Sequence, residues 1–315
     1  MLIDTHCHLH DPEWFTSEQS ELFLQEAREN GVQKVICIGT NPQDSEVARD
    51  YANAHDDVYW TYGIHPEFCR SPREENVDIF FRGDAQNIER SEFASQPEML
   101  VMPELSSFRE SPEIKVTDVC RERLKERSAD REEREPRKDG RSTGSLKANV
   151  SNLNSRLVAI GEIGLDYHYD GYDRTAQIRL FEQMLQLALD LKLPVSLHIR
   201  EAFTDAFAVI DNFSGIYGVV HSFTGSKKDL RQALERGFYI GVNGLCTYTT
   251  NPLPPLEKML LETDAPFLTP IPFRGTINKP GYVKTIATYL AEKLGVAEAN
   301  IVEQTTQNAR NIFQV

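Results

Sequence analysis

The sequence predicts an α/β fold, a (β/α)8 TIM barrel that spans residues 1–315 as a single domain. Short apolar or β-branched runs alternate with longer segments of helical period, which is typical of repeated βα units and a parallel sheet. Eight such runs are present, and eight strands with intervening helices favour a closed barrel over an open sheet. The chain is also long enough for one barrel of about 250 residues plus an appendage.

The predicted strands are short and are separated by longer segments. They are LIDT (2–5), KVICI (34–38), VYWTY (58–62), LVAIG (157–161), PVSL (194–197), YGVV (217–220), FYIGV (238–242) and KMLLE (258–262). Two of the intervening segments have clear helical spacing, from Ser17 to Asn30 and from Arg174 to Leu191. Apolar residues recur there every three to four positions, so each segment can bury one face against the sheet.

A long connection separates the third and fourth predicted strands, and we interpret residues 84–152 as an insert within the barrel. From Arg121 to Asn149 it is dense in charged residues, Ser and Gly and has almost no apolar residue. Such a segment buries too little surface to offset its ordering entropy, so we expect disorder over most of 121–152 and loose attachment of 84–120. The alternative is a nucleic-acid-binding arm, but acidic residues nearly balance the basic ones.

The connection between the seventh and eighth strands, residues 243–257, is short and contains Pro252, Pro254 and Pro255. Proline removes backbone donors and disfavours helix, so a covering helix hardly fits. The outward side chains of these strands, Tyr239 or Ile240 and Met259 or Leu260, should then lose part of their cover. This predicts one thin wall, reduced stability and self-association through that wall.

The composition is that of a globular protein, with 40% hydrophobic and 26% charged residues. We see neither a run of about 18 apolar residues nor a secretory signal pattern, which favours a cytoplasmic or nuclear location without membrane association. No obligate protein partner is indicated.

The five cysteines are scattered without a CxxC pair, so we expect reduced thiols. A net charge of −14 argues against a broad basic surface for nucleic acid. It does not exclude nucleic acid as a substrate, because bound divalent cations can supply local positive charge.

Histidines collect at the carboxyl ends of the predicted strands, where barrel enzymes place their chemistry. His6, His8, His65, His198 and His221 all lie there, and Glu162 and Asp264 follow strands four and eight. A single histidine at a strand end is usually an ordinary core or surface residue, but five that converge are hard to dismiss. In an extended segment residues i and i+2 face the same side, so His6 and His8 lie together and Cys7 faces away to pack.

Six of these residues form a predicted metal-binding set: His6, His8, Glu162, His198, His221 and Asp264. Four imidazoles and two carboxylates are enough for two divalent ions, Mg, Mn or Zn, with one carboxylate bridging them. Such a pair can clamp a phosphodiester and acidify a bound water. The sequence contains no GxSxG elbow and no GxxxxGK[ST] loop, so serine catalysis and nucleotide triphosphate hydrolysis lack support.

Seven motifs in order resemble those of the TatD-like deoxyribonuclease family, in the branch with an amino-terminal HxH. They are DTHCHLH, GIHPEF (63–68), GEIGLDYHYD (161–170), PVSLHIREA (194–202), VVHSFTGS (219–226), ETDAPFLTP (262–270) and RGTINKP (274–280). Each motif is weak alone, but their order makes chance an unconvincing explanation. The resemblance covers about residues 1–81 and 153–315.

The resemblance implies a divalent-metal-dependent nuclease that cleaves DNA, often from a 3′ end. It implies that His6, His8 and Asp264 hold one metal, that His198 and His221 hold the other, and that Glu162 bridges them. Glu162 and Asp264 would be the catalytic residues, with Asp264 orienting or deprotonating the attacking water. His65 and Arg274 would contact phosphate, and Asn278 would fix the last loop. Asp166 and His168 would support ligands rather than bind metal.

Two other functions remain open at this stage. An amidohydrolase-type enzyme acting on small molecules would have a similar barrel, but such enzymes commonly bridge their metals with a modified lysine on strand four, where this chain has Glu162. A non-catalytic barrel scaffold is the other alternative. The long insert and the short 243–257 connection favour a scaffold, whereas the intact set of candidate ligands argues against it.

Overall fold

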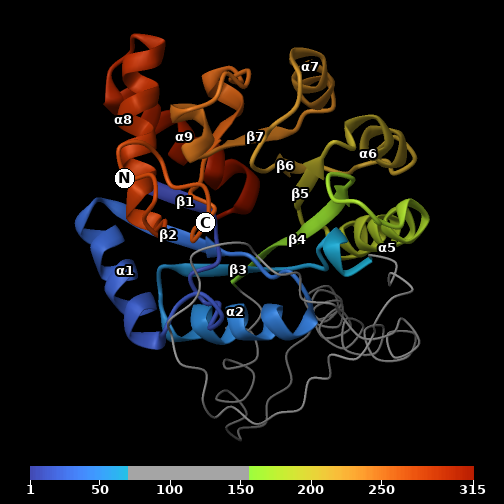
Figure 1. The fold of residues 1–315 in the computed structure, drawn as a ribbon, viewed down its shortest axis with the longest axis horizontal. Coiled ribbons are helices and arrows are strands. Elements are labelled where there is room, and N and C mark those ends of the chain that lie inside the picture. Colours follow the sequence, from blue (N-terminus) through green and yellow to red (C-terminus); the bar gives the residue numbers. More distant parts are fainter. Residues whose placement is uncertain (70–155) are drawn as a thin grey trace, which may run out of the picture.

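The computed structural model describes residues 1–69 and 156–315 and shows one eight-stranded parallel sheet in the order β1 to β8 (Figure 1). The strands are β1 (Leu2–Cys7), β2 (Val32–Cys37), β3 (Val58–Tyr62), β4 (Leu157–Asp166), β5 (Val195–Arg200), β6 (Gly218–Val220), β7 (Tyr239–Val242) and β8 (Met259–Leu261). The α-helices are α1 (Ser17–Glu29), α2 (Pro42–Ala54), α5 (Arg174–Leu191), α6 (Phe203–Ile210), α7 (Lys227–Glu235), α8 (Val283–Leu294) and α9 (Glu298–Phe313). The predicted (β/α)8 barrel is confirmed.

The helices begin where side chains can satisfy the free amides of the first turn. Thr16 caps α1 and forms a reciprocal capping box with Gln19, and Ser226 and Asp229 do the same for α7. The helix predicted from Arg174 to Leu191 has those bounds, and α1 ends one residue before its predicted end. Short 3-10 turns at η1 (Pro66–Cys69), η3 (Gly244–Thr247), η4 (Leu256–Lys258) and η5 (Pro280–Tyr282) complete the described elements.

All eight predicted strands are present, but three extend further at their carboxyl ends than predicted. β1, β4 and β5 continue through His6, Glu162 and His198, so these residues lie within strands rather than beyond them. β4 is longest because it stays paired with β5 as far as Asp166 and Arg200. The extension places Glu162 inside the barrel mouth, with ligand-bearing strands around it.

The barrel closes between β8 and β1, through backbone contacts that also position the candidate ligands. Cys7 forms a parallel bridge with Ala265, the His8 amide donates to Ala265 O (2.8 Å), and the Asp264 amide donates to His6 O (2.8 Å). Buried Asp4 accepts from the Thr263 amide (2.9 Å) and hydroxyl (2.6 Å). The closing seam therefore holds Asp264 beside His6 and His8.

One cluster of buried apolar residues fills the barrel interior. It combines residues of five strands that lie around the whole ring, including Ile3, Ile36, Val158, Val219 and Leu260. Residues on opposite strands can share a cluster only if they point into the lumen. The end of α9 contributes Ala309, Ile312 and Phe313 to the same cluster, so the C-terminal helix closes this core. The opposite end of the lumen is left to polar residues.

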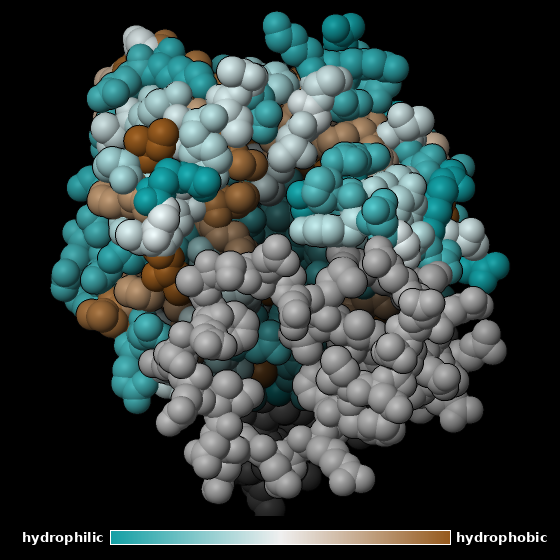
Figure 2. Space-filling view, viewed as in Figure 1, coloured by the Kyte–Doolittle hydropathy of each residue, from teal (hydrophilic) through white to brown (hydrophobic). Residues whose placement is uncertain are grey.

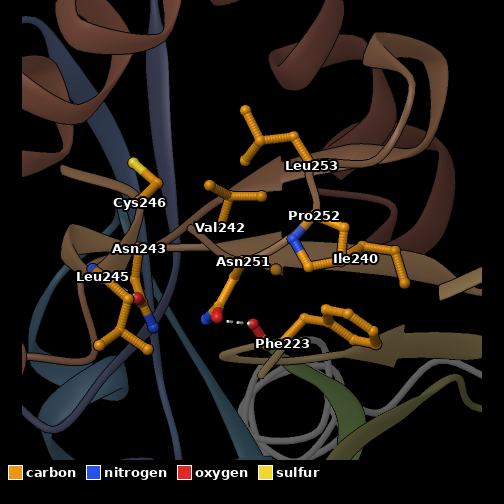
Figure 3. Close-up of a pocket in the computed structure, with 10 residues that line it drawn as sticks. Phe223, Ile240, Val242, Asn243, Leu245, Cys246, Asn251, Pro252 and Leu253 are labelled. Carbon is orange, nitrogen blue, oxygen red and sulfur yellow. Dashed lines mark hydrogen bonds between the residues drawn. The ribbon is translucent and has the colours of Figure 1, made fainter. Parts of the chain in front are cut away.

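The prediction of a thin wall at β7 and β8 is wrong. The connection contains no α-helix, as predicted, but Ile240 and Met259 are fully buried and Tyr239 is half-buried, while Leu260 belongs to the cluster in the barrel interior. Figure 3 shows the connection itself folded over the wall, with Pro252 and Leu253 beside Ile240 and Val242. Helix α9 packs on β8, and α8 packs on β8 and η3. The sequence did not reveal that helices after the last strand also cover this wall.

The residues drawn in Figure 3 line a small cavity within this cover. Its volume is about 20 Å³. That volume holds about one water molecule, so the cavity is too small for a substrate.

The molecular face in Figure 2 has a central hollow, with apolar side chains along its border on the side of α1 and α8. The insert predicted at 84–152 lies outside the described residues. Within 1–69 and 156–315, no helix combines the length and apolarity needed to cross a bilayer.

Candidate metal centre

All six predicted metal ligands meet at the carboxyl end of the barrel. His6, Glu162 and His198 come from strands, whereas His8, His221 and Asp264 follow the ends of β1, β6 and β8. Three overlapping groups have ligand atoms within 4.8 Å of one another: His6, His221 and Asp264; His6, His8 and Glu162; and His65, Glu162 and His198. The parallel register explains this meeting, because the carboxyl ends of all strands lie at one end of the barrel.

Glu162 stands at the middle of the group, and its two carboxylate oxygens face different histidines. Oε1 lies 2.8 Å from His198 Nδ1 and 2.7 Å from His221 Nε2. Oε2 lies 3.4 Å from His6 Nε2. A carboxylate that presents one oxygen to each of two imidazole groups has the arrangement expected of a bridging ligand.

Asp264 is the candidate ligand that lies beside His6 and His8. Its Oδ1 lies 3.4 Å from His6 Nε2 and 3.7 Å from His8 Nε2. Its backbone has a positive φ of 58°, a conformation that is uncommon for a residue other than glycine and that clusters at functional sites. The seam hydrogen bond to His6 O holds this turn in place.

Burial and neighbouring charges shift the pKa values of these side chains in opposite directions. Burial lowers the pKa of His8 and His198, but their carboxylate neighbours outweigh it and raise these pKa values to about 9 and about 10. Burial and the nearby His221 lower the pKa of His6 to about 4. Burial raises the pKa of Glu162, yet the surrounding histidines hold it well below its usual range. At neutral pH the metal-free group therefore combines neutral His6 with protonated His8 and His198.

Two further carboxylates lie near the ring nitrogens of His198 and His221 that do not face Glu162. Asp166 Oδ2 lies 3.1 Å from His198 Nε2, which agrees with its predicted supporting position. Glu262 Oε1 lies 3.9 Å from His221 Nδ1 and accepts from the Ser222 amide (2.6 Å). A carboxylate at hydrogen-bond distance from the second imidazole nitrogen, as Asp166 is, orients a metal-binding histidine and raises its basicity. Glu262 lies near His221 but is not hydrogen-bonded to it.

Glu262 is a residue that the sequence reasoning missed. It is almost fully buried (1% exposed), its Oε2 has no hydrogen-bond partner, and burial raises its pKa to about 7. A Cβ on Gly241 would lie 2.2 Å from Glu262 Oε2, so the glycine leaves space for the carboxylate. The available signal was the other acidic residue in ETDAP, two positions before Asp264.

The remaining predicted residues are placed differently. His65 is buried, with Nε2 3.6 Å from Glu162 Oε1, and its Nδ1 accepts from the Glu67 amide (3.2 Å). Arg274 is exposed and lies over the Tyr248 ring, 4.1 Å from its centroid, with no described contact to the six candidate ligands. Asn278 is buried and donates to Thr263 O and Phe267 O, so it ties the last loop to the turn around Asp264. His168 is paired with Glu201 near the surface rather than with this group.

The donor set fits divalent metal ions. His6 Nδ1, His6 Nε2 and His221 Nδ1 are buried without a hydrogen-bond partner in the described structure. Buried polar atoms are rarely left unpaired, because desolvation without a partner costs about 1–3 kcal/mol. Imidazole nitrogens beside carboxylates are the ligands that zinc and manganese accept. The chain would hold such ions with His6, His8 and Asp264 on one side, and with His198 and His221 on the other.

Comparisons with known proteins show the family and the fold of this chain. The family model described as TatD related DNase matches residues 3–314. An uncharacterized metal-dependent hydrolase, YabD of Bacillus subtilis, is 26% identical over the full length of both chains. The deoxyribonuclease Tat-D of Schizosaccharomyces pombe is 44% identical over 38% of this chain and 41% of its own. The crystal structure of YjjV, a TatD homolog from Escherichia coli, superposes with a TM-score of 0.71 at 23% identity, covering 100% of this chain and 98% of that one, and shows the shared fold.

Proposed function

The chain belongs to the TatD-related DNase family of metal-dependent hydrolases, and we propose that it cleaves phosphodiester bonds of DNA with two divalent metal ions. One observation supports this most strongly. The two oxygens of Glu162 face different histidines, Oε1 facing His198 and His221 and Oε2 facing His6. A single bound ion would need only one of these oxygens.

The residues of the site take distinct roles in the proposed reaction. Glu162 would hold both ions, and Asp264, beside His6 and His8, would orient the attacking water or accept its proton. His65 receives a hydrogen bond at Nδ1 from the Glu67 amide, so its other nitrogen carries the proton and faces the site. It would donate that hydrogen to a phosphate oxygen. Bound metal ions would supply the positive charge that stabilises the phosphodiester and acidifies water.

The choice of DNA over a small-molecule substrate rests on the family and on the sequence of β4. The fission yeast relative is named a deoxyribonuclease, and the motif series of this chain resembles that of the family. β4, whose sequence is LVAIGEIGLD, contains no lysine, which distinguishes this site from amidohydrolases with a lysine bridge. Arg274, exposed in the loop before Asn278, is proposed to meet a neighbouring phosphate, although it now stacks on Tyr248.

Direct assay of the purified chain tests the proposal. End-labelled single- and double-stranded DNA is incubated with magnesium, manganese or zinc, and with a chelator as control. We expect cleavage that the chelator abolishes, with product sizes that show whether digestion proceeds from a 3′ end. Cleavage that persists in the chelator, or no cleavage with any of the three metals, would refute the proposal.

A further inference from the structure

Two exposed aromatic side chains lie together at the mouth of the barrel, beside the metal centre. Trp14, in the segment between β1 and α1, is 47% exposed, and Phe267, which follows β8, is 42% exposed. Their ring centroids are 5.0 Å apart and their planes form an angle of 79°. The Phe267 ring is also 6.4 Å from the ring of His8, a candidate metal ligand. The aromatic pair of Trp14 and Phe267 is therefore next to the metal centre.

Hydrogen bonds hold the backbone that carries both rings. The amides of Trp14 and Phe15 donate to Asp11 O, and the Phe15 side chain is buried in the core. The Phe267 amide donates to Asp264 O (2.8 Å), and its carbonyl accepts from Asn278. Large apolar rings that are held in water beside a polar site are typical of binding surfaces, because exposure forgoes their burial free energy.

The edge-to-face geometry leaves ring faces open. By contrast, Phe273 and Tyr282 in the neighbouring loop stack face to face, 4.3 Å apart and 3° from parallel, and Arg274 covers Tyr248. Those rings already have partners on a face. Trp14 and Phe267 can still accept a flat ligand.

The charges around Trp14 indicate which part of a nucleic acid it would meet. Glu13 directly precedes it in the sequence and Asp11 lies three positions before it, and burial together with the charges of Asp11 and Asp44 raises the pKa of Glu13. This acidic surrounding repels a phosphate backbone. It leaves an uncharged aromatic base as the compatible ligand, since every nucleobase offers a π face for stacking.

We propose that Trp14 and Phe267 form a stacking site for the nucleobase of the nucleotide next to the scissile phosphate. This proposal rests on the proposed function, because it takes the metal centre as the place where the phosphate binds. The site would hold an unpaired base, since a base within a duplex has its faces covered by its neighbours. It would thus contribute to the choice between frayed or single-stranded ends and intact duplex.

Intrinsic fluorescence reports on this site without any cleavage. The chain has two tryptophans, and Trp60 is buried within β3 at 2% exposure, so a base that stacks at the surface would affect Trp14. The probe is a single-stranded oligothymidylate whose terminal linkages are phosphorothioates, with an abasic strand of equal length as control. We expect quenching by the first and none by the second. Trp14→Phe should lose the signal while it keeps binding.

Kinetics with two cleavable strands, a normal single strand and one with an abasic end, separates stacking from a structural role. Trp14→Ala should raise KM for a normal single strand about 5- to 150-fold, leave kcat within about twofold, and leave KM for the abasic-ended strand unchanged. Trp14→Phe should restore most of the affinity. The matched control is Tyr217→Ala, which removes an exposed aromatic (41%) just before β6, at the opposite end of the strands.

The outcomes for the two proposals are distinguishable. Equal quenching by both strands, or an equal rise of KM for both strands in Trp14→Ala, would overturn the stacking site even if DNA is cleaved normally. If the parent chain cleaves neither strand with any metal, the proposed function fails. Selective quenching of Trp14 by the base-containing strand would still support the stacking site in that case.

Discussion

The two sides of the candidate metal centre differ in how completely the protein prepares them. On the Glu162 Oε1 side, His198 and His221 already contact the carboxylate at 2.8 and 2.7 Å. Each also has a second carboxylate behind it, Asp166 or Glu262. We call this the His198 half.

The His6 half consists of His6, His8 and Asp264. Its shortest contacts are 3.4 Å and 3.7 Å, and both ring nitrogens of His6 lack a hydrogen-bond partner in the described structure. This difference in contacts predicts that the two halves bind their ions with different affinities. The His198 half is held in place by supporting carboxylates and should bind its ion more tightly, whereas the His6 half should depend on its ion to draw the ligands together.

The largest effect should follow from removing the residue that both halves share. Glu162→Gln should lower the metal-dependent cleavage rate by about 100-fold or more, because a neutral amide cannot hold two cations. The melting temperature of the metal-free protein should remain close to that of the parent. Rates and metal content are compared with those of Glu292→Gln, an exposed glutamate on α8. A variant that retains two ions and a rate within about tenfold of the parent would disprove the bridging role.

A smaller effect should separate the halves. Glu262→Gln and Asp166→Asn should each weaken metal binding to the His198 half about 10- to 100-fold, because a neutral group behind the imidazole lowers its basicity. Calorimetric titration should show one affinity reduced and the other unchanged. Asp211→Asn, which breaks an exposed pair with Arg236, is the control. An equal loss at both sites, or none, would mean that these carboxylates do not distinguish the halves.

Metal binding should also release protons. The pKa of His198 is raised to about 10 and that of His8 to about 9, so both rings carry a proton at pH 7 that a metal ion must displace. Affinity should therefore rise as pH increases from 7 toward 9. Titrations in buffers of different ionisation enthalpy should show at least about one proton released per chain. Enthalpies that do not vary with the buffer would contradict this protonation.

The smallest effect is expected from the insert. Replacing Arg121–Asn149 by a short Gly/Ser linker should leave the melting temperature and the cleavage rate nearly unchanged, because loop-closure entropy depends only weakly on length. A large loss of DNA affinity at low salt, with the rate at saturation preserved, would instead support a nucleic-acid-binding arm.

The sequence predicted the strands and the candidate ligands for one physical reason. Parallel strands bring their carboxyl ends to one end of a barrel, so residues at those ends, such as His6, His198 and Asp264, must be neighbours. It could not predict how the barrel wall is covered. Proline content correctly indicated that residues 243–257 form no α-helix, but not that Leu253 folds back and that α9 packs on β8.

Residues that support a candidate ligand, rather than binding metal themselves, were also hard to predict. Glu262 is one of many acidic residues in the sequence, and its position behind His221 depends on the space left by Gly241 on the neighbouring strand. No local pattern encodes that contact, because it joins three strands. The exposure of Trp14 was likewise invisible, since WF at 14–15 gives no sign that Phe15 is buried and Trp14 is not.

A crystal structure with manganese, with ions located by anomalous scattering, tests the central claim most directly. We predict two peaks about 3.5–4 Å apart on either side of the Glu162 carboxylate. One should be held by His198 and His221, and the other, with the lower occupancy at limiting manganese, by His6, His8 and Asp264. A single peak at saturating manganese, or two peaks that do not share Glu162, would contradict the account.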